Sequence, residues 1–529
     1  MPRLMLALIA SMITMSLPAS SPERARLVVG IMVDGLDNDC LELLQSRFGS
    51  GGLNRLSHDG VVILNADYGT PLDAAAATAM FVTGASPSIS GIPGERIYNR
   101  EKLRTEEIFI DPSTLGNFTG ATYSPARLLT STLSDEARIA AGGINAVYAI
   151  AADPAQAIIL AGHSANCGIW LDSRTGNWAS STFYKEMPTA VSARNRLKPL
   201  SMRLDTMSWT PALQPSQYPD LPDHLGHYPF RYVFPHGNAG RFEMFAQSAL
   251  INTEITDIAI DLLNGLSLGS HEGVDVLNLS YNLTPYPYTK GTDSRFEQMD
   301  SYIRLDRQLE RLFNAVDGRL GKDKALIVLA GTPRSNSRRR DDERWNIPYG
   351  EFSTRKAISL LNLYLMALHG NGDYVEAYHD GAFYLNHKLI KEKSLDLGDL
   401  RRESAEFLVR MHGVRTAYTL DDIISRRAGD NPDALRRNTH IASAGDIVIT
   451  LLPGFDLIDD SCTPASSGRV QQTLVQAAPV APVFILAPDV DPRTIDTPTD
   501  IRVVAPTVAR LLRIRSPNGA ALAPLNLSR

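Results

Sequence analysis

The chain has 529 residues, with 52 Lys and Arg against 58 Asp and Glu, which gives a formal net charge of −6. This mildly acidic balance argues against a general nucleic-acid-binding protein, whose surface is normally basic. Three cysteines without a Cys-x-x-Cys pair exclude a disulfide framework and give no support for a thiolate zinc site.

The first segment has the layout of a secretory signal peptide. A short basic start, Met1 to Arg3, precedes an uncharged, mostly apolar run from Leu4 to Leu17, and small residues follow up to position 21. At about 14 residues this run is shorter than the roughly 20 residues of a membrane-spanning helix. We therefore expect residues 1–21 to be removed and the mature protein to be exported, with the periplasm as its destination and no membrane span.

Beyond this segment, short apolar runs end at loops and are followed by helical patterns. Continuous apolar runs, rather than alternating ones, are typical of strands that are covered on both faces. The pattern predicts a doubly wound α/β fold with a mainly parallel central sheet and helices on both faces. The runs lie at 26–33, 146–151, 274–279, 325–330, 447–452 and 483–486.

Two regions interrupt this pattern. Residues 185–240 are rich in Pro, Tyr and Trp without a clear period, which predicts an irregular excursion from the domain. Residues 352–440 contain two helical stretches and predict an inserted subdomain. We expect residues 22–529 to form a single α/β domain that carries both.

Several segments, taken in order, resemble a known family. The matching stretches are VVGIMVDGL at 28–36, FVTGASPSISGIPG at 81–94, SPARLLTSTLSDEARIA at 124–140, AGHSANCGIWLD at 161–172, SYIRLDRQLERLF at 301–313 and WNIPYGEF at 345–352. They resemble the alkaline phosphatase superfamily, in particular the large periplasmic enzymes of the type I phosphodiesterase/nucleotide pyrophosphatase group. The resemblance implies hydrolysis of phosphate esters by a Thr or Ser at a helix N-terminus, assisted by two zinc ions.

The nucleophile expected from this resemblance is missing. In the family a Thr precedes the Thr-Gly dipeptide of the following helix by about nine residues, and this position is Ala74. A methyl group can neither attack phosphorus nor bind a metal. We expect the neighbouring Asp73 to cap the helix, so that its carboxylate occupies the amides that a phosphate would need.

Most of the family's metal ligands are also missing. Asp34, directly after the first strand, matches a zinc ligand and would be a vestige of the site. The remaining family positions carry residues that cannot form the zinc site, namely Thr284, Tyr288, Thr332, Pro333 and Ser467. Because zinc sites in proteins use three or four ligands, we expect no metal cofactor.

The substrate-binding positions differ too. The resemblance places a phosphate-binding Asn at Glu95 and a Lys-x-Arg pair at Asp153 and Ala155. Two of these three replacements put negative charge where a phosphate dianion would lie, which would repel it. We therefore expect no catalytic and no substrate-binding residues of the family type.

These losses favour an exported pseudoenzyme, which resembles a phosphoric ester hydrolase but acts as a binding or scaffold module. One alternative is an active metal-dependent phosphomonoesterase or phosphodiesterase that uses relocated residues, with candidates at His236, His271, His379 and His387. Another is a carbohydrate- or peptide-binding accessory protein with an aromatic platform around Trp209. The basic run Arg334, Arg338, Arg339 and Arg340 could bind an anionic partner. The sequence identifies no other partner.

Overall fold

The computed structural model describes residues 25–184, 187–221, 223–227, 229–238, 240–289, 293–322, 324–332, 350–452, 454–460, 471–473, 479–488 and 490–527. The expectations for the signal peptide, Pro333, the basic run at 334–340 and Ser467 lie outside these residues. No helix in the described part of the chain is long and apolar enough to cross a membrane.

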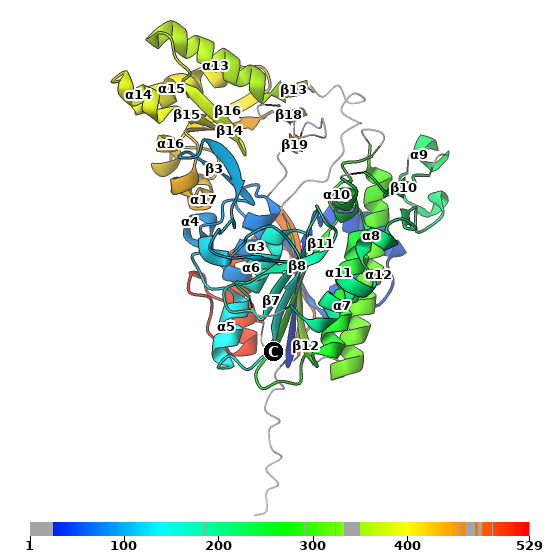
Figure 1. The fold of residues 1–529 in the computed structure, drawn as a ribbon. Helices are drawn as coiled ribbons and strands as arrows, with labels where there is room; N and C mark the ends of the chain where they lie inside the picture. The colour runs from blue at the N-terminus through cyan, green and yellow to red at the C-terminus, as the bar shows by residue number, and fades with distance from the viewer. Residues whose placement is uncertain are drawn as a thin grey trace, which may run out of the picture.

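A large mixed sheet forms the centre of the molecule, with helices on both sides (Figure 1). Strands β1, β11, β12, β6 and β7 pair in parallel, whereas β20 is antiparallel to both of its neighbours, β12 and β2. The strand order is β21 (Arg493–Ile495), β2 (Val61–Asp67), β20 (Val480–Leu486), β12 (Ala325–Gly331), β1 (Leu27–Asp34), β11 (Asp275–Asn282), β6 (Val147–Ile150), β7 (Cys167–Leu171), β8 (Trp178–Ser181) and β5 (Gly116–Asn117), and β22 (Thr499–Asp500) pairs with β2. The α/β fold expected from the sequence is therefore confirmed, and the mainly parallel sheet also contains antiparallel pairs on both sides of β20 and between β7, β8 and β5.

The central strand β1 shows why this sheet is buried on both faces. All eight of its residues are buried, and alternate side chains enter two different cores. Val28 and Met32 pack against one helical layer, whereas Val29 and Ile31 pack against the other. This alternation of apolar side chains on both faces explains the continuous apolar run in the sequence.

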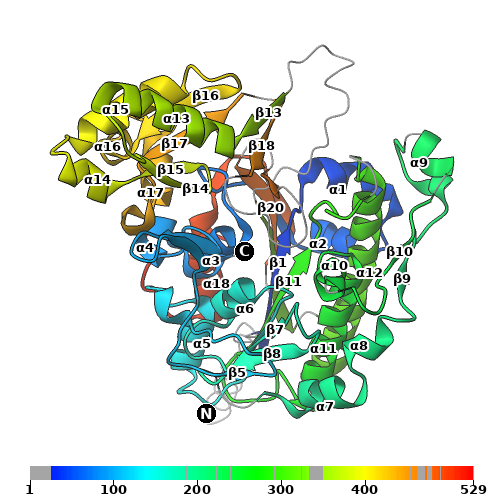
Figure 2. The ribbon, with the colours of Figure 1, turned by 45° about the horizontal axis from the view of Figure 1, so that its top comes forward.

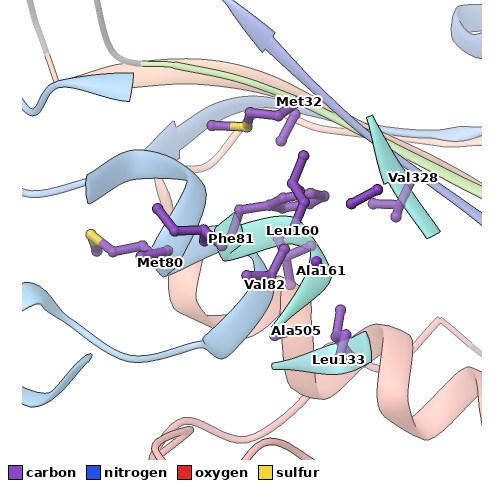
Figure 3. Close-up of a cluster of buried hydrophobic side chains, with 14 of the residues drawn as sticks. Met32, Met80, Phe81, Val82, Leu133, Leu160, Ala161, Val328 and Ala505 are labelled. Atoms are coloured by element: carbon purple, nitrogen blue, oxygen red, sulfur yellow. The ribbon is translucent and has the colours of Figure 1, made fainter. Parts of the chain in front are cut away.

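One layer of helices packs against the face that includes Met32, and Figure 3 shows part of that core around Phe81 and Leu160. Its helices are α3 (Ala74–Thr83), α5 (Leu133–Ala140), α6 (Pro154–Ala161) and α18 (Val504–Leu512). The opposite layer contains α1 (Asn38–Leu44), α2 (Leu53–Asp59), α7 (Thr189–Leu197), α8 (Leu200–Arg203), α10 (Arg241–Ala246), α11 (Leu250–Gly265) and α12 (Arg295–Leu320). Shorter elements are α4 (Pro87–Ser90), β3 (Arg96–Asn99), β4 (Arg104–Glu107), β9 (Ser208–Trp209), α9 (Asp223–His227) and β10 (Tyr232–Val233).

A subdomain with its own core lies above α3 and α4 in Figure 2. The run at 447–452, expected among the strands of the central sheet, instead belongs to a four-stranded sheet of this subdomain. Its elements are β13 (Gly350–Ser353), α13 (Thr354–His369), β14 (Val375–His379), β15 (Ala382–Leu385), α14 (His387–Glu392), α15 (Leu397–Leu408), β16 (Val414–Thr419), α16 (Leu420–Ile424), α17 (Pro432–Asn438), β17 (Ile447–Leu451), β18 (Phe455–Asp459) and β19 (Gln471–Thr473).

A buried carboxylate joins this subdomain to the central domain. Asp446 has no exposed side-chain surface, and its oxygens accept hydrogen bonds from Arg401 Nη2 at 2.7 Å and His387 Nε2 at 2.9 Å, both within the subdomain. They also accept one from Arg100 Nη2 at 2.7 Å, and Arg100 follows β3 of the central domain. We call these four residues the Asp446 clamp.

Candidate functional site

Strands β1, β11 and β12 end at the same edge of the central sheet, which is where ligands bind in open α/β folds. Asp34 is the last residue of β1 and lies beside Asn282, its register neighbour on β11. Thr332 follows β12 on the other side. The structure thus brings together three positions at which the family resemblance implies metal ligands, namely Asp34, Thr332 and the segment that follows Asn282.

Hydrogen bonds from neighbouring loops hold Asp34 in place. The Thr332 hydroxyl donates to Asp34 Oδ1 at 2.7 Å, and the same hydroxyl oxygen accepts from the Gly35 amide at 3.0 Å. Both Asp34 and Thr332 are buried. Thr332 therefore closes the loop after β1 by hydrogen bonding.

Hydrogen bonds and ring contacts stabilise the segment after β11. Both the amide and the hydroxyl of Thr284 donate to Asn282 Oδ1, at 2.8 and 2.6 Å. Tyr288 contacts the ring of Tyr286 at 5.4 Å, and Tyr286 packs 5.0 Å from Trp209. The two family ligand positions in this segment, 284 and 288, thus form a turn and part of an aromatic cluster.

The described donors around Asp34 do not fit zinc. A threonine hydroxyl and an asparagine amide are poor ligands for zinc, which prefers imidazole, thiolate and carboxylate groups. Within the described ranges, no group of three or more His, Cys, Asp and Glu side chains could hold a metal ion. In the part of the chain that the structure describes, the residues around Asp34 therefore do not fit the zinc site that the resemblance implies.

Helix α3 begins at Ala74, as expected for the helix that carries the nucleophile in the family. Asp73 is its N-cap residue, and its Oδ1 accepts from the Ala76 amide at 2.8 Å, which confirms the expected cap. Its Oδ2 accepts from the Glu95 amide at 2.6 Å. The nearby hydroxyl of Thr78 is buried and donates to the Ala74 carbonyl oxygen at 2.6 Å, so it is directed back into the helix.

Glu95 and Asp153 lie close enough for their side chains to hydrogen-bond to each other. Asp153 also caps α6 by accepting from the Gln156 amide at 3.1 Å. Burial raises the pKa of Asp153, hydrogen bonds from Glu95 and Gln156 lower it in part, and the charge of Glu107 raises it further. Two positions that would contact phosphate in the family therefore form a carboxyl pair, while Ala155 is buried in the first turn of α6.

A family model described as "Type I phosphodiesterase / nucleotide pyrophosphatase" matches residues 28–473. The chain belongs to this family. Alkaline phosphatase PafA of Elizabethkingia meningoseptica is 26% identical to it over 95% of this chain and 94% of that protein. Alkaline phosphatase PhoV of Synechococcus elongatus is 25% identical over 94% of this chain and 92% of that protein.

The crystal structure of wild-type PafA has a TM-score of 0.81, with 23% identity over 96% of this chain and 99% of the PafA chain. This likeness shows that the two proteins share a fold. A solved PafA variant, with a TM-score of 0.80 and 24% identity over the same shares of the two chains, carries substitutions at a threonine, an asparagine, a lysine and an arginine.

Four histidines were candidates for relocated metal ligands in this phosphodiesterase-family protein. His271 pairs with Asp275 at 2.7 Å, and Asp275 begins β11, at the opposite end of the sheet from Asp34. The other three also have partners away from Asp34: His236 pairs with Asp205 at 3.6 Å, His379 with the Arg96 backbone oxygen at 3.0 Å and His387 with Asp446 at 2.9 Å. The structure does not gather these four residues around Asp34.

The expectation of an aromatic platform at Trp209 is wrong. Trp209 is only 1% exposed, and its Nε1 donates to the buried Asp300 Oδ2 at 2.6 Å. Tyr218 donates to Asp300 Oδ1, also at 2.6 Å. These rings anchor the irregular excursion to α12, so they do not present an open surface to a sugar or peptide.

Sequence reasoning missed the roles of two residues that shape the site, Thr332 and Glu107. Thr332 was noted only as a missing ligand, whereas it holds Asp34 in place. Glu107 accepts a hydrogen bond from the Tyr123 hydroxyl and faces Asp153. No motif marks these residues, because each acts through a partner that is distant in the sequence.

Proposed function

We propose that this protein is an exported, non-catalytic member of the type I phosphodiesterase family that works as a binding or scaffold module. The observation that carries the proposal is the N-terminus of α3. Ala74 stands where the resemblance implies the nucleophile, and the Asp73 carboxylate occupies an amide of the first turn. In an active site this helix end would be free to bind phosphate.

Charge around this helix end supports the same proposal. Asp73, Glu95 and Asp153 are linked by the hydrogen bonds described above. At an effective dielectric constant of about 20, each negative charge about 4 Å from a phosphate charge costs on the order of 4 kcal/mol. A phosphate dianion would therefore meet repulsion where the family supplies attraction.

The donors around Asp34 support the absence of a zinc cofactor. Thr284, Tyr288 and Thr332 stand where the resemblance implies ligands. Thr332 already uses its hydroxyl to hold Asp34 and Gly35. Export is supported by the signal-like segment at 1–21. We also propose that the basic run at Arg334, Arg338, Arg339 and Arg340 binds an anionic partner.

The test uses the mature protein, residues 22–529, purified beside the Asp34→Ala variant. Metal content is measured by mass spectrometry, and turnover is measured with p-nitrophenyl phosphate and its bis ester. We expect no stoichiometric zinc and no turnover above that of Asp34→Ala, which reports contaminating phosphatases. Stoichiometric zinc together with turnover that Asp34→Ala abolishes would overturn the proposal and establish the alternative, a metal-dependent hydrolase with relocated residues.

A second variant tests the role of the lost nucleophile separately. Ala74→Thr restores a hydroxyl at the start of α3, but it restores neither metal ligands nor the positive phosphate contacts. We expect this variant to remain inactive on both esters. Turnover that appears in Ala74→Thr and is removed by a chelator would show that a working metal site survives.

A further inference from the structure

A cavity of about 550 Å³ lies between the central domain and the subdomain. One wall is the loop before α3, at 69–72, together with the start of β3, and the other walls come from β14 to β17 and α17. None of Asp34, Ala74, Glu95, Asp153 and Ala155 lines it. The cavity therefore lies next to the family site without including these five residues, and its volume lies within the range of small-molecule pockets.

The lining of this cavity is mainly apolar, and its rings are fixed. Tyr384 packs 4.6 Å from Tyr98, and its hydroxyl donates to the Ser443 oxygen at 2.9 Å. Phe455 is held by an edge contact with His412 at 4.9 Å. Because these side chains are already ordered, a ligand would lose little affinity to ordering them.

Charges around the cavity are balanced. Arg96 and Arg415 contribute two positive charges, and Asp380 and Asp430 contribute two negative ones. Arg415 and Asp430 are 3.7 Å apart and neutralise each other. Burial lowers the pKa of His440 and the charge of Arg127 lowers it further, so this imidazole is neutral at pH 7. Because these charges cancel, a phosphate dianion would gain no net electrostatic attraction here. An uncharged molecule with an apolar body would instead be favoured by contact with the apolar lining.

We propose that this cavity binds an uncharged, mainly apolar organic molecule that contains at least one ring. The ligand would lie between the two parts of the molecule, beside Gly445, which precedes Asp446 of the clamp. Binding therefore stabilises the packing of the subdomain on the central domain. This inference goes beyond the proposed function, because ligand binding here requires neither the loss nor the presence of hydrolysis.

The probe for this proposal is N-phenyl-1-naphthylamine, a neutral aromatic molecule whose fluorescence rises in apolar surroundings. It is titrated into the mature protein and into Val448→Trp, in which a large ring fills the cavity from β17. The matched control is Val409→Trp, at an exposed valine that does not line the cavity. We expect saturable binding at one site in the wild type and the control, and at least tenfold weaker binding in Val448→Trp.

Competition tests the chemical class. Neutral 1-naphthol is expected to displace the probe, and 1-naphthyl phosphate at the same concentration is not. Equal binding by the two tryptophan variants, or displacement by the phosphate, would overturn the proposal. Leu435→Trp, which fills the cavity from α17, replaces Val448→Trp if circular dichroism shows that the latter is unfolded. Because probe binding needs no zinc and no turnover, an active enzyme that binds the probe would overturn only the proposed function.

Discussion

Removal of one charge from the Asp446 clamp should loosen the subdomain from the central domain. The perturbation is Asp446→Asn, which keeps the shape of the side chain and removes its charge. In the wild type the two carboxylate oxygens accept from Arg401 at 3.0 and 2.7 Å, from His387 at 2.9 Å, from Arg100 at 2.7 Å and from the Leu385 amide at 2.8 Å. An asparagine side chain is neutral and cannot balance the positive charges of Arg100 and Arg401, which face this buried position.

The expected magnitude follows from the burial of the clamp. Removing one partner of a buried ion pair costs about 3–5 kcal/mol, because the remaining charge stays desolvated. Asp421 supplies a matched control, since it also pairs with Arg401, at 3.0 Å, but its side chain is 50% exposed. Asp421→Asn should cost less than about 1 kcal/mol, as is usual for exposed pairs.

The difference in the free energy of unfolding between Asp446→Asn and the wild type should disappear in strong acid. Burial alone would raise the pKa of Asp446, but hydrogen bonds from His387 and the charge of Arg100 outweigh it and hold the pKa well below its usual range. A carboxyl group with a lowered pKa contributes stability above its unfolded pKa, which is about 3.9. That contribution is lost as the pH falls through the folded pKa, so the two proteins should converge in strong acid.

Hydrogen exchange of residues 350–459, combined with urea unfolding, measures both effects. We expect Asp446→Asn to exchange faster across the subdomain at pH 7 while amides of β1 and β11 keep their protection. If Asp446→Asn destabilises no more than Asp421→Asn, the clamp contributes nothing beyond a surface ion pair and the reasoning is wrong.

Two further predictions concern buried carboxylates. Asp153→Asn should raise the free energy of unfolding at pH 7, because the raised pKa of Asp153 means that its ionised form opposes folding there. The extra stability of the variant should disappear below about pH 4, where Asp153 of the wild type is protonated in the folded and unfolded states. Thermal unfolding across pH 4–8 measures this difference. A pH-independent difference would contradict it. Asp300→Asn should cost about 3 kcal/mol and shift tryptophan emission to the red, because Trp209 and Tyr218 lose their common charged acceptor; unchanged emission would show that ring packing alone holds the excursion.

Local chemistry made part of this protein predictable from the sequence. The run at 26–33 predicted a strand covered on both faces, and β1 alternates its side chains between two cores. The residues around Ala74 predicted a helix start with Asp73 as its cap, since an N-cap needs only neighbours within one turn. The run at 447–452 was misplaced, because a short apolar run shows that a strand is buried but not which sheet it joins.

Only the tertiary structure decided the contacts between residues that are far apart in the chain. Thr332 reaches Asp34 across 298 positions, and Asp300 removes Trp209 from solvent across 91. The ligand cavity likewise needs the central domain and the subdomain together. The amino-acid sequence alone determined which reactive groups the chain has, because that is covalent chemistry. Their neighbours, burial and charge depended on how distant strands and helices pack.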